Sequence, residues 1–83
     1  MEGTFIGKVQ HFYFKISVAV LEPSETLKVG DTIRIIGDDG IDFTQPVESM
    51  EIEHKQIKEA KPGDLIGLKV NQRVHRGCCV HKL

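Results

Sequence analysis

The sequence predicts an all-β fold: a single small antiparallel β-barrel of about six or seven strands, formed by residues 1–83. Apolar and polar residues alternate over several stretches, which is typical of half-buried strands. Turn residues separate these stretches, and no segment has an apolar face long enough for a crossover helix, so an antiparallel barrel is favoured over an α/β sheet. With 83 residues, of which 40% are hydrophobic, the chain can bury one modest core.

The clearest alternation lies in HFYFKISVAVL, residues 11–21, which is predicted to be one long strand after a short strand in TFIGKV. On the long strand one face is expected to point into the core, and it consists of Phe12, Phe14, Ile16, Val18 and Val20. Ala19 would then lie on the opposite face, because neighbouring residues of a strand point in opposite directions.

The next strand is predicted in TIRII, residues 32–36, with Ile33 and Ile35 buried. GDDG follows it and indicates a turn. Two segments, LKVGDTIRI and AKPGDLIGL, share a Lys-x-Gly-Asp pattern ahead of apolar alternation. The glycine can adopt the φ of a tight reversal and the aspartate can accept backbone N–H bonds, so each pattern is interpreted as a turn that starts a strand.

QPVESMEIEH, residues 45–54, breaks the period of two once. Val47, Met50 and Ile52 can all be buried only if one extra residue is inserted near position 48 or 49, which predicts a β-bulge there. Pro46 cannot donate a ladder hydrogen bond, so the start of this strand is expected at a sheet edge or a strand entry. KQIKEA, residues 55–60, has too few apolar residues for a helix and is predicted to be a short strand that leads into a turn.

The order of these segments resembles the second domain of the translational GTPases, the small β-barrel of elongation factors Tu and G. The resemblance runs from Gly7 to Lys82, and its most specific part joins VESMEI to AKPGDLIGL. Gly67 looks like the glycine that permits close packing in that barrel. Similar barrels also occur as appendages, for example at the C-terminus of a collagenase-like peptidase family.

The resemblance implies a non-enzymatic binding module of the translation machinery, which docks RNA (tRNA or ribosomal RNA) or a protein partner. The chain has no GxxxxGK[ST] motif, so we expect it to bind no GTP by itself. The alternative is a protein-interaction subunit or accessory barrel of a separately encoded enzyme, with no nucleic-acid role. Fold resemblance alone does not select between the two.

The charged residues nearly balance, with 11 Lys and Arg against 12 Asp and Glu, which argues against binding through bulk positive charge. The exception is the C-terminal segment, because residues 65–83 contain basic residues and no acidic ones. The predicted binding residues for an anionic partner are Arg34, Lys55, Lys58, Lys69, Arg73, His75 and Arg76.

Two adjacent cysteines lie between two histidines in the last stretch, VHRGCCVHKL. Because Cys78 would share the inward face with Val80, only Cys79 and His81 are expected to point outward together. Zinc sites use about four converging ligands, so neither a metal site nor a cofactor is predicted.

No apolar run reaches the roughly 20 residues that span a membrane, and we expect a cytoplasmic protein without a membrane partner.

Overall fold

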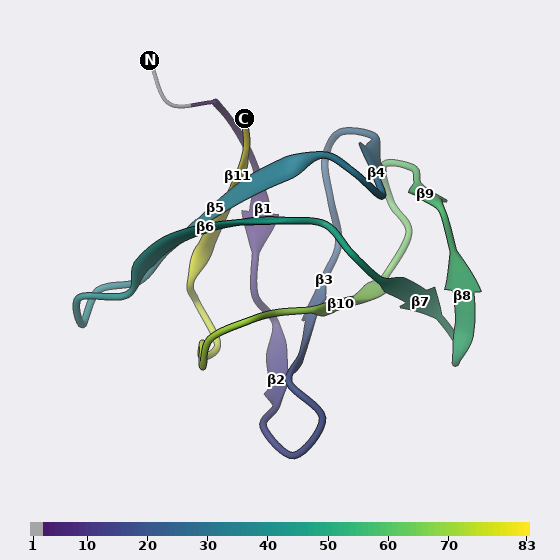
Figure 1. Cartoon of the computed structure of the whole chain (residues 1–83). Helices are drawn as coiled ribbons and strands as arrows, with labels where there is room; N and C mark the ends of the chain where they lie inside the picture. Colours follow the sequence, from purple (N-terminus) through teal and green to yellow (C-terminus); the bar gives the residue numbers. More distant parts are fainter. Residues whose placement is uncertain (1–2) are drawn as a thin grey trace.

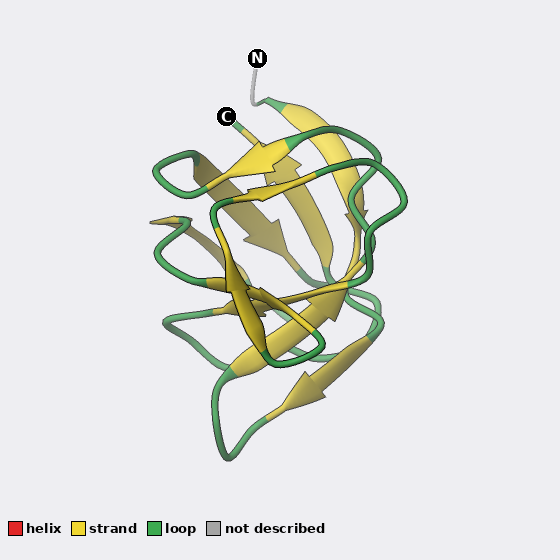
Figure 2. Ribbon diagram, turned by 90° about the vertical axis from the view of Figure 1, so that its right-hand side faces the viewer, coloured by secondary structure: helices red, strands yellow, loops and turns green. Residues whose placement is uncertain are grey.

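The computed structural model describes residues 3–83, which form antiparallel strands and turns and contain no helix (Figure 1, Figure 2). The strands in chain order are β1 Thr4–Lys8, β2 His11–Tyr13, β3 Val18–Leu21, β4 Leu27–Lys28, β5 Thr32–Ile36, β6 Asp42–Pro46, β7 Met50–Ile52, β8 Lys55–Ile57, β9 Glu59–Ala60, β10 Ile66–Lys69 and β11 Cys79–Lys82. The predicted all-β, antiparallel fold is confirmed, although the strands are shorter and more numerous than the six or seven expected.

The strands form three sheets around one core. One sheet has the order β1-β11-β5-β6, the second has the order β2-β3-β10-β7-β8, and β4 pairs with β9. The largest fully buried side chains belong to all three sheets, and they include Ile6, Leu21, Leu27, Ile33, Ile35, Met50, Ile66 and Leu68. Within residues 3–83 there is no helix that is long and apolar enough to cross a membrane.

The two Gly-Asp turns have the predicted geometry. Asp31 Oδ2 accepts a hydrogen bond from the Lys28 backbone N–H at 2.8 Å, and Asp64 Oδ2 accepts one from Lys61 at 2.9 Å. The glycine before each aspartate has a positive φ, 101° at residue 30 and 92° at residue 63. Because such a φ is strained for residues with a Cβ, both turns depend on glycine.

The prediction of one long strand over residues 11–21 is wrong. These residues form a hairpin, in which Tyr13 of β2 pairs with Val18 of β3. The hairpin tip projects at the bottom of Figure 1. Ser17 has a φ of 56°, a left-handed conformation that reverses the chain and that alternation of apolar residues does not reveal. Phe14 and Ile16, both predicted to be buried, are 66% and 56% exposed.

The predicted bulge at residue 48 or 49 is also wrong. β6 ends at Pro46 and β7 begins at Met50, so the chain leaves one sheet and enters the other between them. Val47 and Met50 are buried as expected, because this crossing segment passes over the core. Pro46 lies on β6, the end strand of its sheet, as its missing N–H predicts.

Gln45 is a buried polar residue that the sequence did not single out. Its side chain is 3% exposed and joins the two large sheets: Nε2 donates to the Lys69 carbonyl oxygen at 3.0 Å, and Oε1 accepts from the Asn71 N–H at 2.7 Å. The amide therefore satisfies backbone groups just where β10 ends, close to the crossing of the chain between sheets.

Replacing Gln45 by leucine is expected to lower the free energy of unfolding by about 1–3 kcal/mol, because buried backbone groups lose their partners. Urea denaturation followed by circular dichroism measures the change. The matched control is Gln10→Leu, since Gln10 is exposed and should change the stability by less than about 0.5 kcal/mol. Equal stability of Gln45→Leu and the control would show that the amide does not stabilise the junction.

Candidate functional site

The outward face of β3 is apolar, although it lies on the surface. Ala19 and Leu21 are buried in the core, whereas Val18 and Val20 are half-buried and lie on the other side of the strand. This is the reverse of the predicted orientation, and it follows from the turn at residues 14–17, which resets the alternation. The core therefore takes one face of β3 and leaves a second apolar face outside.

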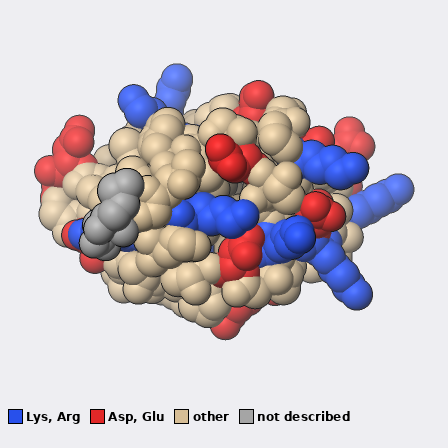
Figure 3. All heavy atoms as spheres, turned by 90° about the horizontal axis from the view of Figure 1, so that it is seen from above, with Lys and Arg blue, Asp and Glu red and all other residues tan. Residues whose placement is uncertain are grey.

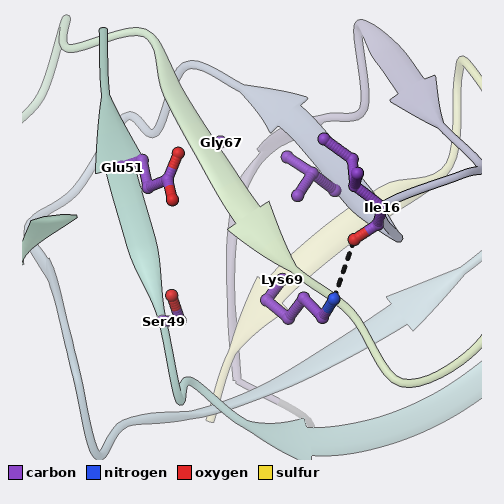
Figure 4. A pocket seen from close by; sticks show the side chains of 6 residues that line it. Ile16, Ser49, Glu51, Gly67 and Lys69 are labelled. Carbon is purple, nitrogen blue, oxygen red and sulfur yellow. Dashed lines mark hydrogen bonds between the residues drawn. The ribbon is translucent and has the colours of Figure 1, made fainter. Parts of the chain in front are cut away.

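A groove extends along this outward face, between β3, β10 and β7. We call it the outer groove, and its apolar lining consists of Tyr13, Ile16, Val18, Val20, Leu65, Ile66 and Gly67. It is made of two adjoining hollows of about 400 and 260 Å³ that share four lining residues, Ile16, Val18, Glu51 and Gly67. Figure 4 shows one of them, with Gly67 on β10 between the side chains of β7 and Ile16.

Gly67 keeps the floor of the outer groove open. It pairs with Val20 of β3 on one side and with Glu51 of β7 on the other. A Cβ at this position would lie 3.0 Å from Val18 Cγ1, which is tighter than ordinary van der Waals contact. The close packing predicted for Gly67 is therefore present, and it leaves an opening at the centre of the sheet.

Polar groups lie along the rim of the groove. Lys69 Nζ donates to the Ile16 carbonyl oxygen at 2.8 Å, which ties the hairpin to β10 (Figure 4). On the opposite rim Glu51 accepts a hydrogen bond from Gln56 Nε2 at 3.1 Å, and Glu53 lies in the same hollow. The groove thus has an apolar floor with carboxylates along the β7 side.

Three large apolar side chains of the groove are unusually exposed. Tyr13 is 50%, Ile16 56% and Leu65 53% accessible. Clustered apolar surface of this kind marks an interaction site more often than scattered single residues do. The signal in the sequence was the uninterrupted run VAVL, which is typical of a strand covered on both faces. The alternation of the preceding residues concealed it.

The predicted binding residues do not form one surface. Arg34 lies on β5 and makes a two-pronged ion pair with Asp42 of β6, with Nε–Oδ1 and Nη2–Oδ2 distances of 2.8 and 2.7 Å. That guanidinium lowers the pKa of Asp42. Lys55 lies on β8 and Lys58 just after it, and β8 belongs to the five-stranded sheet rather than to the sheet that contains Arg34. Their role in binding stays a prediction.

Charges of both signs are interleaved on the surface shown in Figure 3, and neither sign dominates it. Three of the four remaining predicted residues do come together, because Arg73, His75 and Arg76 line one hollow beside β2. Lys69 belongs instead to the outer groove.

His75 joins the β10–β11 loop to the GDDG turn. Its Nδ1 lies 2.9 Å from the Arg76 carbonyl oxygen and its Nε2 3.1 Å from Asp39 Oδ1. Only the protonated imidazole can donate from both nitrogens. The bond to the Arg76 carbonyl, and then the bond to Asp39, raise the pKa of His75 above 6.5, while the His75 bond lowers the pKa of Asp39.

The cysteines lie as predicted: Cys78 is buried, and Cys79 and His81 are partly exposed on the outward side of β11. The His81 ring packs edge-on against Phe5 of β1, with centroids 5.7 Å apart. Among residues 3–83 no three His, Cys, Asp or Glu side chains are grouped so that they could hold a metal ion.

Comparison with known proteins connects this chain to peptidases. No family model matches it. It is 45% identical over 78 residues to an uncharacterized protease of Methanocaldococcus jannaschii. That stretch is 94% of this chain but 19% of the relative, so the chain spans about a fifth of the curated protein it matches.

Two crystal structures of the C-terminal domain of a putative U32 peptidase from Geobacillus thermoleovorans have the same fold. Their TM-scores are 0.87 and 0.88, and both are 21% identical in sequence to this chain. They cover 94% and 96% of this chain, and the matches span 98% and 92% of the peptidase domain. At this identity the likeness shows the fold alone.

The resemblance to the second domain of translational GTPases is therefore wrong as an identification, because the comparisons point to peptidase-associated proteins instead. The residues that suggested it include the two Gly-Asp turns and the alternating core positions, which serve the fold rather than a particular function, and Gly67, which forms the floor of the outer groove. The expectation of RNA or the ribosome as a partner loses its basis with it.

The His75 contacts lead to a pH-dependent prediction. Because the pKa of His75 is raised in the folded state, its protonation stabilises the fold below about pH 6.5, and this stabilisation is lost as the pH rises through the raised value. An NMR titration of the His75 ring should give a pKa above 6.5. Asp39→Asn should lower that pKa, and Asp38→Asn, which removes only a nearby charge, should lower it less. An unchanged pKa in Asp39→Asn would contradict the assigned contact.

Proposed function

We propose that this chain is a non-catalytic accessory β domain of a U32 peptidase-like protein. The observation that carries the proposal is the 45% identity that extends over 94% of the chain yet takes up only 19% of a protease. The remaining four fifths of that relative leave ample length for a separate catalytic part. The fold supports the same assignment, because it matches a domain described as the C-terminal domain of a peptidase.

We also infer that the two large sheets close into one barrel. β1 leads into β2 through Val9, whose N–H donates to the Cys78 carbonyl oxygen at 2.8 Å, and the next N–H, of Gln10, donates to Val20 at 2.8 Å. At the opposite side β6 leads into β7, and the Gln45 side-chain amide donates a hydrogen bond to the carbonyl oxygen of Lys69 at the end of β10. If β1 continues into β2, and β6 into β7, each pair acts as one strand that belongs to both sheets. The ring then has the order β1/β2, β11, β5, β6/β7, β10 and β3, with β4, β8 and β9 outside it.

The outer groove is the surface through which the domain would dock on the peptidase-like part. Complete burial of an aliphatic side chain contributes about 1.5–3 kcal/mol, so covering the exposed halves of Ile16 and Leu65 would contribute roughly 1 kcal/mol each. Neighbouring Val18 and Val20 would add apolar area to the same contact. The carboxylates of the β7 rim would select a partner surface with basic residues around apolar ones. A location in the cytoplasm stays a prediction.

A binding experiment in trans tests the proposal. The M. jannaschii protease is purified without the stretch that matches this chain, and this chain is added during analytical ultracentrifugation. We expect a one-to-one complex, and we expect none with the intact protease, whose own domain occupies the site. No complex at about 100 µM of both components, which corresponds to roughly 5.5 kcal/mol of binding free energy, would reject the accessory role.

The same assay examines the outer groove. Leu65→Lys should weaken the complex about tenfold or more, because it replaces buried apolar area by an unpaired charge. The matched control is Val29→Lys, since Val29 is also an exposed apolar residue but lies beside β4, away from the groove. Equal loss of affinity in the two variants would mean that the groove is not the contact.

A further inference from the structure

A second candidate surface lies along the free edge of β2, apart from the outer groove. β2 is the end strand of its sheet and pairs only with β3 among the described strands. The β10–β11 loop runs beside it, held by the Gly77 N–H, which donates to the Val9 carbonyl oxygen at 2.8 Å, and by the buried side chain of Val74. Between the strand and the loop is a hollow of about 270 Å³.

The lining of this hollow is basic and contains no acidic residue. It consists of His11, Phe12, Phe14, Arg73, Val74, His75 and Arg76. Among residues 3–83, Arg73 and Arg76 form neither an ion pair nor a side-chain hydrogen bond, in contrast to Arg34, which is paired with Asp42. The two guanidinium groups are exposed and can donate hydrogen bonds to carboxylates without breaking an existing contact.

Apolar and backbone groups complete the surface. Phe14 is the most exposed large apolar side chain on the described surface and projects from the hairpin tip next to the two arginines. The outer edge of β2 carries backbone N–H and C=O groups that no second strand covers. An uncovered strand edge is the usual template for an added strand.

We propose that this surface, the β2 edge with the 73–76 loop, binds an extended acidic segment of a polypeptide. The segment pairs its backbone with β2, places its carboxylates against Arg73 and Arg76, and packs an apolar side chain on Phe14. The hollow between β2 and the loop shares no residue with the two hollows of the outer groove, which β2 reaches only through Tyr13, and the proposal does not rest on the accessory role.

The observations favour a peptide over a nucleic acid. The chain has a net charge of −1, and Asp39 lies against His75 at the margin of the hollow. A polyphosphate backbone requires an extended basic surface, whereas two arginines beside a free strand edge match alternating carboxylates on one strand. Side chains of a strand alternate, so every second residue of the segment would face the arginines.

The test is fluorescence anisotropy with the whole chain and a fluorescein-labelled peptide of alternating glutamate and valine. We expect saturable binding that weakens with salt, and no binding of the matched peptide with lysine in place of glutamate. Arg73→Gln and Arg76→Gln should each reduce affinity up to about fivefold, as for exposed ion pairs. The control Lys61→Gln removes the same charge from the turn before β10 and should leave affinity unchanged.

Amide hydrogen exchange provides the second measurement. Exchange at His11 to Tyr13 should slow when the peptide is bound, which a purely electrostatic contact at the loop would not produce. Equal binding of the lysine peptide, unchanged affinity in both arginine variants, or unchanged exchange along β2 would overturn the proposal. So would tighter binding of a single-stranded RNA or of anionic phospholipid vesicles than of the acidic peptide.

Discussion

The structure depends on one constraint: successive residues of a strand point to opposite sides, so a strand can give only one of its faces to a single core. β3 has apolar residues on both faces, and the core takes Ala19 and Leu21. Val18 and Val20 are therefore left on the surface, beside Ile16 of the hairpin and Leu65 ahead of β10. The described strands provide no second layer over them, and we propose that another part of a larger protein covers them.

The architecture around this constraint uses local and long-range devices together. Asp31 and Asp64 start β5 and β10 through bonds within their own turns. Gln45 acts over a longer distance, because it joins β6 to the end of β10 where the chain crosses from one sheet to the other. The hairpin tip is held by Lys69, whose ammonium group donates a hydrogen bond to the Ile16 carbonyl oxygen.

Local chemistry in the sequence was sufficient for part of the fold. The strands at residues 4–8 and 32–36, the two Gly-Asp turns and the inward direction of Cys78 follow from alternation and turn residues, and the structure confirms them. The break at Ser17 could not be predicted, because a left-handed φ in a serine leaves no pattern in its neighbours. The crossing between Pro46 and Met50 was also hidden, because it depends on where the second sheet lies. The sequence did indicate the basic cluster at residues 73–76, but it concealed the outer groove, whose residues come from the four strands β2, β3, β7 and β10 and from the turns next to them.

We propose that the outer groove lies against the larger, peptidase-like part of a protein, and a crystal structure of the intact M. jannaschii protease tests this most directly. We expect the positions aligned with Ile16, Val18, Leu65 and Gly67 to be buried there against the other four fifths of the protease. If those positions are open to solvent while a different face, such as that of β5 and β6, makes the contact, the central claim is contradicted.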